Sequence, residues 1–159
     1  MEFRRANAEE KHIIAGIYEK VKGSEFCTWN EFYPTMDEVE HDFSNNGLYC
    51  LVDGGELLGA LSVVQPNEMD LLDCWTQKTG LIKEIARIVV APNHQGKGLA
   101  KLMVNKMVEE FGKMGVTAIH LSVAKKNLPA QKAYQNVGFK TVGETVMYGG
   151  DYNLMEYVF

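Results

Sequence analysis

The sequence contains little cysteine, no excess of positive charge and no long apolar run. Its three cysteines, Cys27, Cys50 and Cys74, are odd in number and show no C-x-x-C spacing, so neither a disulfide framework nor a zinc site is expected. The formal net charge of -5 disfavours nucleic acid and anionic membranes as partners. The first residues lack the apolar stretch of a signal peptide or membrane span, so we expect a cytoplasmic protein.

The remaining composition is that of an ordinary globular protein. The chain has 159 residues, of which 46% are hydrophobic and 23% are charged, a balance that supports a packed core. No repeat, linker or low-complexity tract divides the sequence. We therefore expect a single domain over residues 1–159.

Hydrophobic periodicity predicts alternating helices and strands. Capping boxes mark two helix starts, Asn7 with Glu10 and Thr35 with Glu38, because a polar side chain can cap free amides while a glutamate bonds back. Further helices are expected over 98–114 and 129–137. Strands are expected over 48–52, 57–64, 81–91, 118–123, 141–148 and 154–159, with tight turns at 53–55 and 149–151. This order predicts an α/β (α+β) fold with a largely antiparallel sheet crossed by a strand-helix-strand unit.

The segment Ile88–Lys101 is the most informative part of the sequence. A strand ends at Pro92, a loop with Gly96 and Gly98 follows, and a helix begins at once. Glycines let a ligand approach the backbone, and the free amides at the start of a helix attract negative charge such as a phosphate. The loop matches neither the Walker pattern nor the complete dinucleotide fingerprint.

Two motifs resemble those of the GNAT superfamily of acyl-CoA-dependent N-acyltransferases. Gln95-Gly96-Lys97-Gly98-Leu99-Ala100 resembles the Q/R-x-x-G-x-G/A signature, with Ala100 where glycine is frequent. Asn127 to Tyr134, followed by Gly138-Phe139, resembles the N-x-x-A-x-x-x-Y-x-x-x-G-F element, and Ile88 to Pro92 is similar to the central strand ending. The order of elements is similar over nearly the full chain. The resemblance implies the GNAT fold, a mixed sheet of about six to seven strands flanked by about four helices.

The resemblance also implies acetyl-CoA as co-substrate. Backbone amides starting at Gln95 or Gly96 would hold the pyrophosphate, through Gly96, Lys97, Gly98, Leu99, Ala100 and Lys101. The unpaired strand edge of Ile88, Val89 and Val90 would bond the two amides of the pantetheine arm, much as it would bond a peptide. Asn127 would contact the same molecule from the second strand-helix junction.

Glu84 is the candidate general base. A free alkylamine is mostly protonated at neutral pH, so a base must remove a proton before the nitrogen can attack. Strand alternation would put Glu84, Ala86, Ile88 and Val90 on one face, next to the thioester. Glu84 could act directly or through a water. Alternatively, it faces solvent or pairs with Lys83 or Arg87.

Tyr134 is the candidate general acid, since the family motif places its phenol near the departing coenzyme A sulfur. The alternative is a tyrosine that is simply buried on a short helix. The amide of Val90 could polarise the thioester carbonyl. We interpret His94 and His120 as structural, because a lone histidine usually is.

The acceptor pocket is expected between the first helices and the last hairpin. Trp29, Tyr33 and Tyr148 are the candidate substrate-binding residues, and aromatic faces with nearby carboxylates would attract a cation. These aromatics could instead pack on the core or form a homodimer interface. The favoured activity is N-acetylation of a small-molecule primary amine. A protein N-terminal or lysine acetyltransferase, and a CoA-binding module without turnover, remain open.

Overall fold

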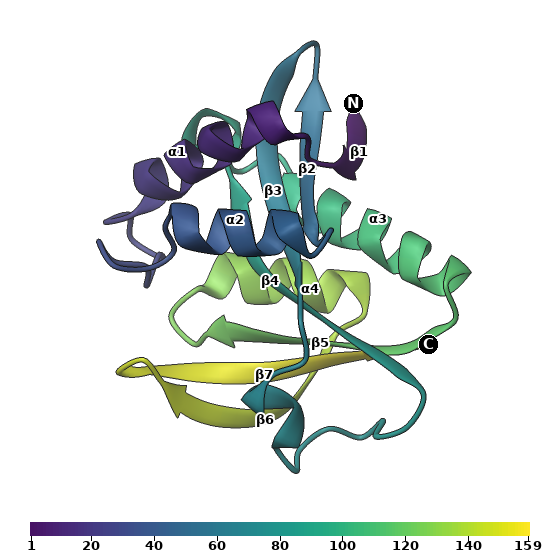
Figure 1. Cartoon of the computed structure of the whole chain (residues 1–159). Coiled ribbons are helices and arrows are strands. Elements are labelled where there is room, and N and C mark those ends of the chain that lie inside the picture. The colour runs from purple at the N-terminus through teal and green to yellow at the C-terminus, as the bar shows by residue number, and fades with distance from the viewer.

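The computed structural model describes residues 1–159 as one mixed sheet with helices on both faces (Figure 1). The seven strands lie in the order β1-β2-β3-β4-β5-β7-β6, and every neighbouring pair is antiparallel except β4 with β5. This confirms the predicted mixed, mostly antiparallel sheet. The strands are β1 (Glu2–Arg5), β2 (Leu48–Asp53), β3 (Glu56–Val64), β4 (Leu81–Val90), β5 (Val116–Ala124), β6 (Lys140–Met147) and β7 (Gly150–Val158).

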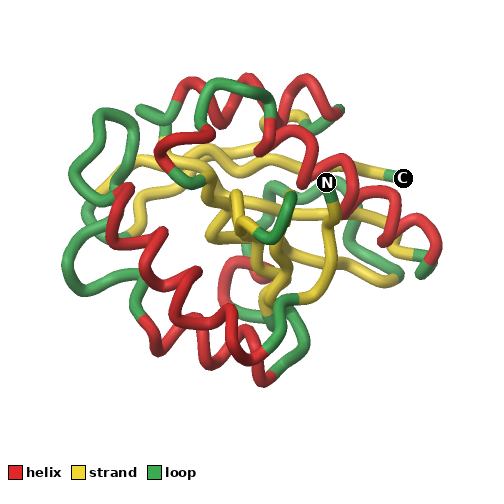
Figure 2. Tube along the Cα trace, turned by 90° about the horizontal axis from the view of Figure 1, so that it is seen from above, coloured by secondary structure: helices red, strands yellow, loops and turns green.

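Four α-helices cover the two faces of the sheet, as the view from above shows (Figure 2). One buried cluster gathers Ile14, Ile17 and Tyr18 of α1 with Val89, and another gathers Met103, Met107 and Phe111 of α3 with Ile85. The apolar faces of α1 and α3 therefore belong to two separate cores. The helices are α1 (Lys11–Val21), α2 (Met36–Ser44), α3 (Leu99–Lys113) and α4 (Leu128–Val137), with short 3-10 turns η1 (Ala8–Glu10), η2 (Glu68–Leu71) and η3 (Pro92–His94). No helix combines the length and apolarity needed to cross a membrane.

Local sequence signals placed most elements correctly. Both predicted capping boxes form, with the Asn7 amide donating to Glu10 at 2.9 Å and the Thr35 amide to Glu38 at 3.2 Å. The strand β1 was missed, because four residues are too short to show periodicity and gain their bonds from β2. The last hairpin turns at Tyr148 and Gly149, with φ of 51° and 74°, so Gly150 and Asp151 already belong to β7.

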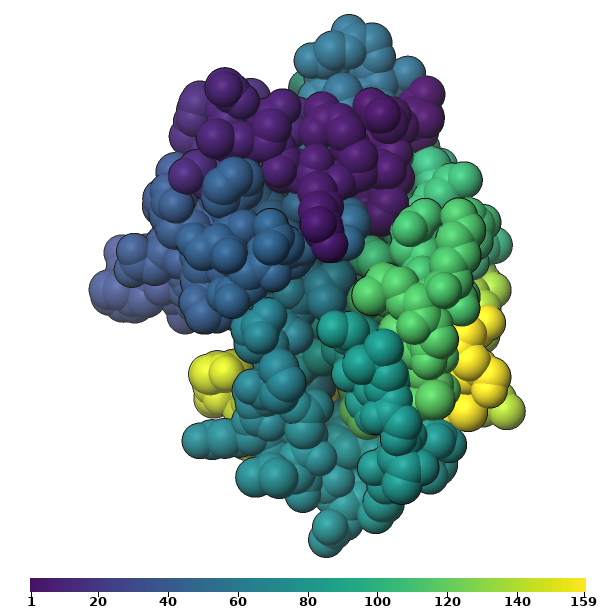
Figure 3. Space-filling view, turned by 45° about the vertical axis from the view of Figure 1, so that its right-hand side comes forward, coloured from purple at the N-terminus to yellow at the C-terminus, as the bar shows by residue number.

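The segment between β3 and β4, residues 65–80, lies over the end of the sheet that carries β5, β7 and β6. In the space-filling view it forms the lower part of the molecule, beside α3 (Figure 3). Its Trp75 is 3% exposed and donates its indole N–H to the Met69 carbonyl at 3.0 Å. The segment has little regular structure but is anchored in a small core of its own with Met69 and Leu154.

Candidate functional site

The site is built where β4 and β5 separate. Their parallel ladder ends at the pair Glu84 and His120, after which β4 stays with β3 as far as Val90 and β5 stays with β7 as far as Ala124. One edge of β4 is therefore left without a strand partner beyond Glu84. An open edge of this kind can bond an extended ligand that carries amides.

The predicted phosphate loop lies at the end of this open edge. Gly96 and Gly98 have φ of 77° and 76°, and an added side chain at either would point into open space. The amide of Gln95 bonds the Pro92 carbonyl at 3.5 Å, whereas those from Gly96 to Lys101 have no acceptor within the chain. These unused donors at the positive end of α3 fit a pyrophosphate.

Two contacts fix the direction of the open edge. The side chain of Gln95 donates to the Val90 carbonyl at 3.1 Å, and the amide of Ala91 donates to Leu58 of β3 at 2.8 Å. Successive amides of a strand point to opposite edges, so the Val90 N–H points into the gap that β5 leaves. Val90 is thus placed to donate to a ligand bound there.

The expectation that Glu84, Ala86, Ile88 and Val90 share one face was wrong. β4 contains a bulge at Arg87, where φ is 49°. Ala60 of β3 pairs with Val89 and Ser62 pairs with Ala86, so Leu61 between them faces two residues of β4. Ile88 and Val90 consequently pack on the α3 side with Ile85, while Val89 packs on the α1 side. The side chain of Val89 therefore points into the core beneath α1, on the opposite face of the sheet from Ile88.

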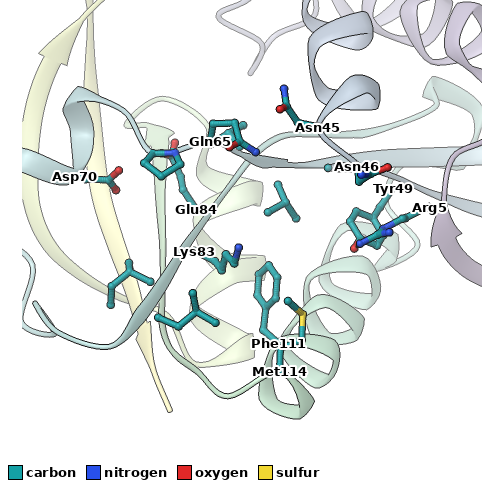
Figure 4. Close-up of a pocket in the computed structure, with 16 residues that line it drawn as sticks. Arg5, Asn45, Asn46, Tyr49, Gln65, Asp70, Lys83, Glu84, Phe111 and Met114 are labelled. Atoms are coloured by element: carbon teal, nitrogen blue, oxygen red, sulfur yellow. The ribbon is translucent and has the colours of Figure 1, made fainter.

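Glu84 is half-buried and points away from Lys83, which lies on the side of Phe111 and Met114 (Figure 4). It borders a hollow of about 400 Å³ and accepts a hydrogen bond from the Asn67 side chain at 2.6 Å. Burial raises the pKa of Glu84 to about 7, with Asp70 acting in the same direction and the Asn67 hydrogen bond opposing both. This carboxyl can take up or release a proton at neutral pH. It forms no ion pair with Lys83 or Arg87.

Tyr134 lies on the other face of the sheet, in the core formed by α3 and α4. It is 6% exposed and contacts Phe139, and its hydroxyl has no hydrogen-bond partner in the chain. Burial raises its pKa above the usual range. Asn127 caps α4 by accepting from the Ala130 amide at 3.2 Å, so its side-chain oxygen is already used and its NH₂ group is free.

The structure brings together two of the three expected acceptor-site aromatics. Tyr33 from the α1–α2 loop stacks on Tyr148 of the β6–β7 turn, with ring centroids 6.2 Å apart. Trp29 instead packs edge-on against Tyr18 at 5.3 Å in the core beneath α1. The Tyr33–Tyr148 pair therefore forms a surface beside the β4 bulge, since Tyr33 bonds Arg87, whereas Trp29 belongs to the core beneath α1.

A buried ion pair lies directly under this surface. Arg87 donates to both carboxylate oxygens of Asp42, at 2.9 and 2.7 Å, and also to the Tyr33 hydroxyl at 2.9 Å. Ser62 donates to Asp42 at 2.7 Å. Because Asp42 is only 1% exposed, the pair holds α2, the Tyr33 loop and the β4 bulge in one arrangement.

Sequence reasoning missed several residues around Glu84. Asn67 and Asp70 come from a stretch without periodicity, and only their own capping-box spacing hints at local order. The Arg87–Asp42 pair spans distant parts of the chain and leaves no local signal. His120, interpreted as an isolated structural residue, forms a buried contact with Glu156.

Comparison with known families decides the identity. The model of the acetyltransferase (GNAT) family matches residues 14–139. This chain belongs to the GNAT acetyltransferase family. The spermidine N(1)-acetyltransferase of Vibrio cholerae is 28% identical over 121 residues, which cover 74% of this chain and 66% of that enzyme. The chain thus spans just under two thirds of that GNAT relative.

Solved structures agree with the fold. A GNAT-family acetyltransferase from Streptococcus agalactiae superimposes with a TM-score of 0.84 at 18% identity, covering 99% of this chain and 95% of that one. A Salmonella typhimurium protein solved with its cofactor acetyl-CoA gives a TM-score of 0.76 at 19% identity, covering 99% and 93% of the two chains. At these identities the likeness establishes the GNAT fold.

Proposed function

We propose that this chain, as one domain over residues 1–159, transfers an acetyl group from acetyl-CoA to a primary amine of a small molecule. One observation carries the proposal. β4 and β5 separate directly after Glu84, and the open edge of β4 leads to the free amides from Gly96 to Lys101. When bound, acetyl-CoA supplies a thioester that an amine can attack, giving an amide and the free thiol. The name of the curated relative from Vibrio cholerae supports an amine acceptor.

The residues present fit a coenzyme A pyrophosphate and its pantetheine arm. The amides from Gly96 to Lys101 would bind the pyrophosphate, with Lys97 and Lys101 adding positive charge in an acidic protein. The edge of Ile88, Val89 and Val90 would bond the pantetheine amides, with the Val90 N–H reaching the thioester oxygen. Asn127 would contribute only its free NH₂ group, because its oxygen caps α4.

Glu84 acts as the general base, directly or through a water. Its pKa of about 7 leaves it partly ionised at neutral pH, so it can accept the proton that a substrate ammonium group must lose. The hollow of about 400 Å³ beside it gives water access to the carboxyl group.

Tyr134 acts as the general acid from the opposite face of the sheet. A thioester bound between the diverging strands would have Glu84 on one side and Tyr134 on the other. The amine could then attack from the side of Glu84 while the sulfur leaves on the side of Tyr134. The Tyr134 hydroxyl makes no bond within the chain and keeps its proton because burial raises its pKa. It can therefore donate to the leaving sulfur.

The acceptor is a cation. Arg87, the positive group beneath Tyr33, is neutralised by Asp42, so it has no charge to offer a substrate carboxylate. The carboxyl groups of Glu84 and Asp70 border the adjacent hollow, whose lining also includes Arg5 and Lys83. The stacked Tyr33 and Tyr148 present aromatic faces to an ammonium group. A polyamine meets these requirements. The cytoplasm as its location and a homodimer as its assembly stay predictions.

Release of free thiol from acetyl-CoA, measured with a panel of amines, amino acids and peptides, tests the proposal. We expect saturable turnover with polyamines or other cationic small amines. Turnover with peptides alone would point to a protein acetyltransferase. Binding of acetyl-CoA by calorimetry without turnover on any member of the panel would point to a CoA-binding module.

A further inference from the structure

Glu156 of β7 is a buried carboxyl group that the proposed reaction does not use. It is 3% exposed, and its only ionisable partner within salt-bridge distance is His120. A buried carboxylate of this kind needs hydrogen-bond donors in place of water. Burial opposes the ionisation of Glu156, but the donors around it outweigh burial and lower its pKa. Glu156 is therefore a carboxylate at neutral pH.

Three of the four groups that bond Glu156 belong to the segment of residues 65–80, namely the Thr76 hydroxyl and the amides of Thr76 and Gln77. The fourth is Nε2 of His120 at 2.9 Å, whose ring lies flat against Trp75 of the same segment with centroids 3.7 Å apart. Hydrogen bonds to a carboxylate are about twice as strong as those between neutral groups. Glu156 is therefore a strong polar anchor for a segment that has little regular structure.

A series of hydrogen bonds leads from this anchor to Glu84. The indole N–H of Trp75 donates to the Met69 carbonyl at 3.0 Å, and the amide of Met69 donates to the Asn67 side-chain oxygen at 2.9 Å. The NH₂ group of Asn67 donates to Glu84 at 2.6 Å, and the amide of Asn67 donates to Asp70 at 2.9 Å. The places of Asn67 and Asp70 beside the proposed base are therefore tied to the place of Trp75.

The segment also covers Glu84. Gln65 and Asp70 line the hollow together with Glu84 (Figure 4). Burial is the main reason why the pKa of Glu84 is raised to about 7; the Asn67 hydrogen bond opposes it, and Asp70 adds to it. Because burial outweighs the hydrogen bond, loosening the segment should move the pKa of Glu84 back toward its ordinary value of 4.5.

We propose that Glu156 is a positioning residue for the reaction: it holds the segment of residues 65–80 over Glu84, and the buried position that results makes Glu84 a base suited to neutral pH. Glu156 acts only through the segment and contacts neither the substrate nor acetyl-CoA. His120 assists it by donating to Glu156 and by packing against Trp75. The inference rests on the proposed role of Glu84, but the hold on the segment can be tested without any substrate.

The test must separate the position of the segment from the charge of Glu156. Removing that negative charge could lower the pKa of Glu84 even if the segment stayed in place, so the decisive variants change no charge. The ionisable groups that face Glu84 or border the same hollow are Asp70 from η2, Arg87 and Lys83 from β4, His120 from β5 and Arg5 from β1.

Two uncharged substitutions loosen the segment from different sides. Thr76→Val removes the hydroxyl that donates to Glu156, and Thr76→Ser, which keeps it, is the matched control. Gly143→Ala acts from β6, because an added Cβ there would lie 2.6 Å from the Cβ of Cys74 and displace the segment.

The first measurement is a carbon-13 NMR titration of the Glu84 carboxyl, assigned with Glu84→Gln, on protein without acetyl-CoA. In Thr76→Val and Gly143→Ala the pKa of Glu84 should fall by about one unit. The amides of Met69 and Gln77 should exchange with solvent faster than in wild type. Thr76→Ser should match wild type in both respects.

Kinetics then show whether the anchor serves the reaction. In Thr76→Val and Gly143→Ala the acidic limb of kcat should move to lower pH with the pKa of Glu84, and kcat at neutral pH should fall about fivefold, because a more acidic carboxyl is a weaker base. The KM for acetyl-CoA should not change. Glu156→Gln should shift the limb in the same direction. Loss of stability alone would not move the limb.

The outcomes distinguish this inference from the proposed function. An unchanged or raised pKa of Glu84 in both Thr76→Val and Gly143→Ala would overturn the inference, even if Glu84→Gln is inactive and the proposed base is correct. If the pKa falls as expected but Glu84→Gln is as active as wild type, Glu156 does hold the segment, whereas the proposed base is wrong and the role of Glu156 in the reaction falls with it.

Discussion

The two sides of the proposed site are built in opposite ways. The proposed acetyl-CoA side, called the donor side, comprises the edge of β4 and the amides from Gly96 to Lys101, which are one continuous piece of main chain. The proposed acceptor side joins Glu84, Asn67 and the Tyr33–Tyr148 pair, which come from four separate parts of the sequence. The donor side therefore depends on backbone conformation, and the acceptor side on distant side chains being held together.

The largest expected effect is on the donor side. Gly98→Trp should weaken acetyl-CoA binding about 100-fold or more, because a bulky side chain would stand in front of the free amides. Isothermal calorimetry measures this directly. Gly115→Trp, at the other end of α3 with φ of 79°, carries the same backbone strain and is the control. Equal binding by the two variants would remove the loop from the donor site.

On the acceptor side, Glu84→Gln should lower kcat by roughly 100-fold or more and leave the acetyl-CoA dissociation constant unchanged. The amide keeps the shape of the side chain but cannot accept a proton. The control is Glu68→Gln, an exposed residue of the neighbouring η2 turn. Weakened acetyl-CoA binding by Glu84→Gln would contradict the division between the two sides.

Tyr134→Phe should lower kcat about tenfold without reducing the melting temperature. The hydroxyl bonds nothing within the chain, so its loss leaves no partner unsatisfied. Tyr18→Phe removes a fully buried hydroxyl without a partner, on the other face, and should retain full activity. An unchanged kcat in Tyr134→Phe would show that this tyrosine only packs in the core and is not the general acid.

The smallest effect concerns the pH profile. Activity should fall below about pH 7 as Glu84 becomes protonated. The Asn67 hydrogen bond lowers the pKa of Glu84, so Asn67→Ala should move this acidic limb to higher pH, by about half a unit. Rates measured from pH 5 to 9 with one amine would show it. A shift to lower pH would mean that Asn67 stabilises the protonated carboxyl.

The contrast between local main-chain features and contacts of distant side chains explains what could be predicted from sequence. The Gly96–Gly98 loop, the capping box at Thr35 and the first hairpin turn depend on residues a few positions apart, so they were identified correctly. The last hairpin turn was placed too far along the chain, because Tyr148 rather than a second glycine takes the positive φ there. The bulge at Arg87 could not be found, because it is held by Asp42 on α2 and has no local mark. The His120–Glu156 contact was missed for the same reason, since it arises only when β5 and β7 pair.

The donor side has one further consequence, for inhibition. The groups proposed to bind the pyrophosphate are peptide N–H groups, which every residue except proline supplies, so replacing the side chain of Lys97 or Ala100 deletes none of them. Resistance to an inhibitor bound to these amides would therefore require a mutation that distorts the loop. Binding of an inhibitor to Tyr33 or Tyr148 could be abolished by a single substitution.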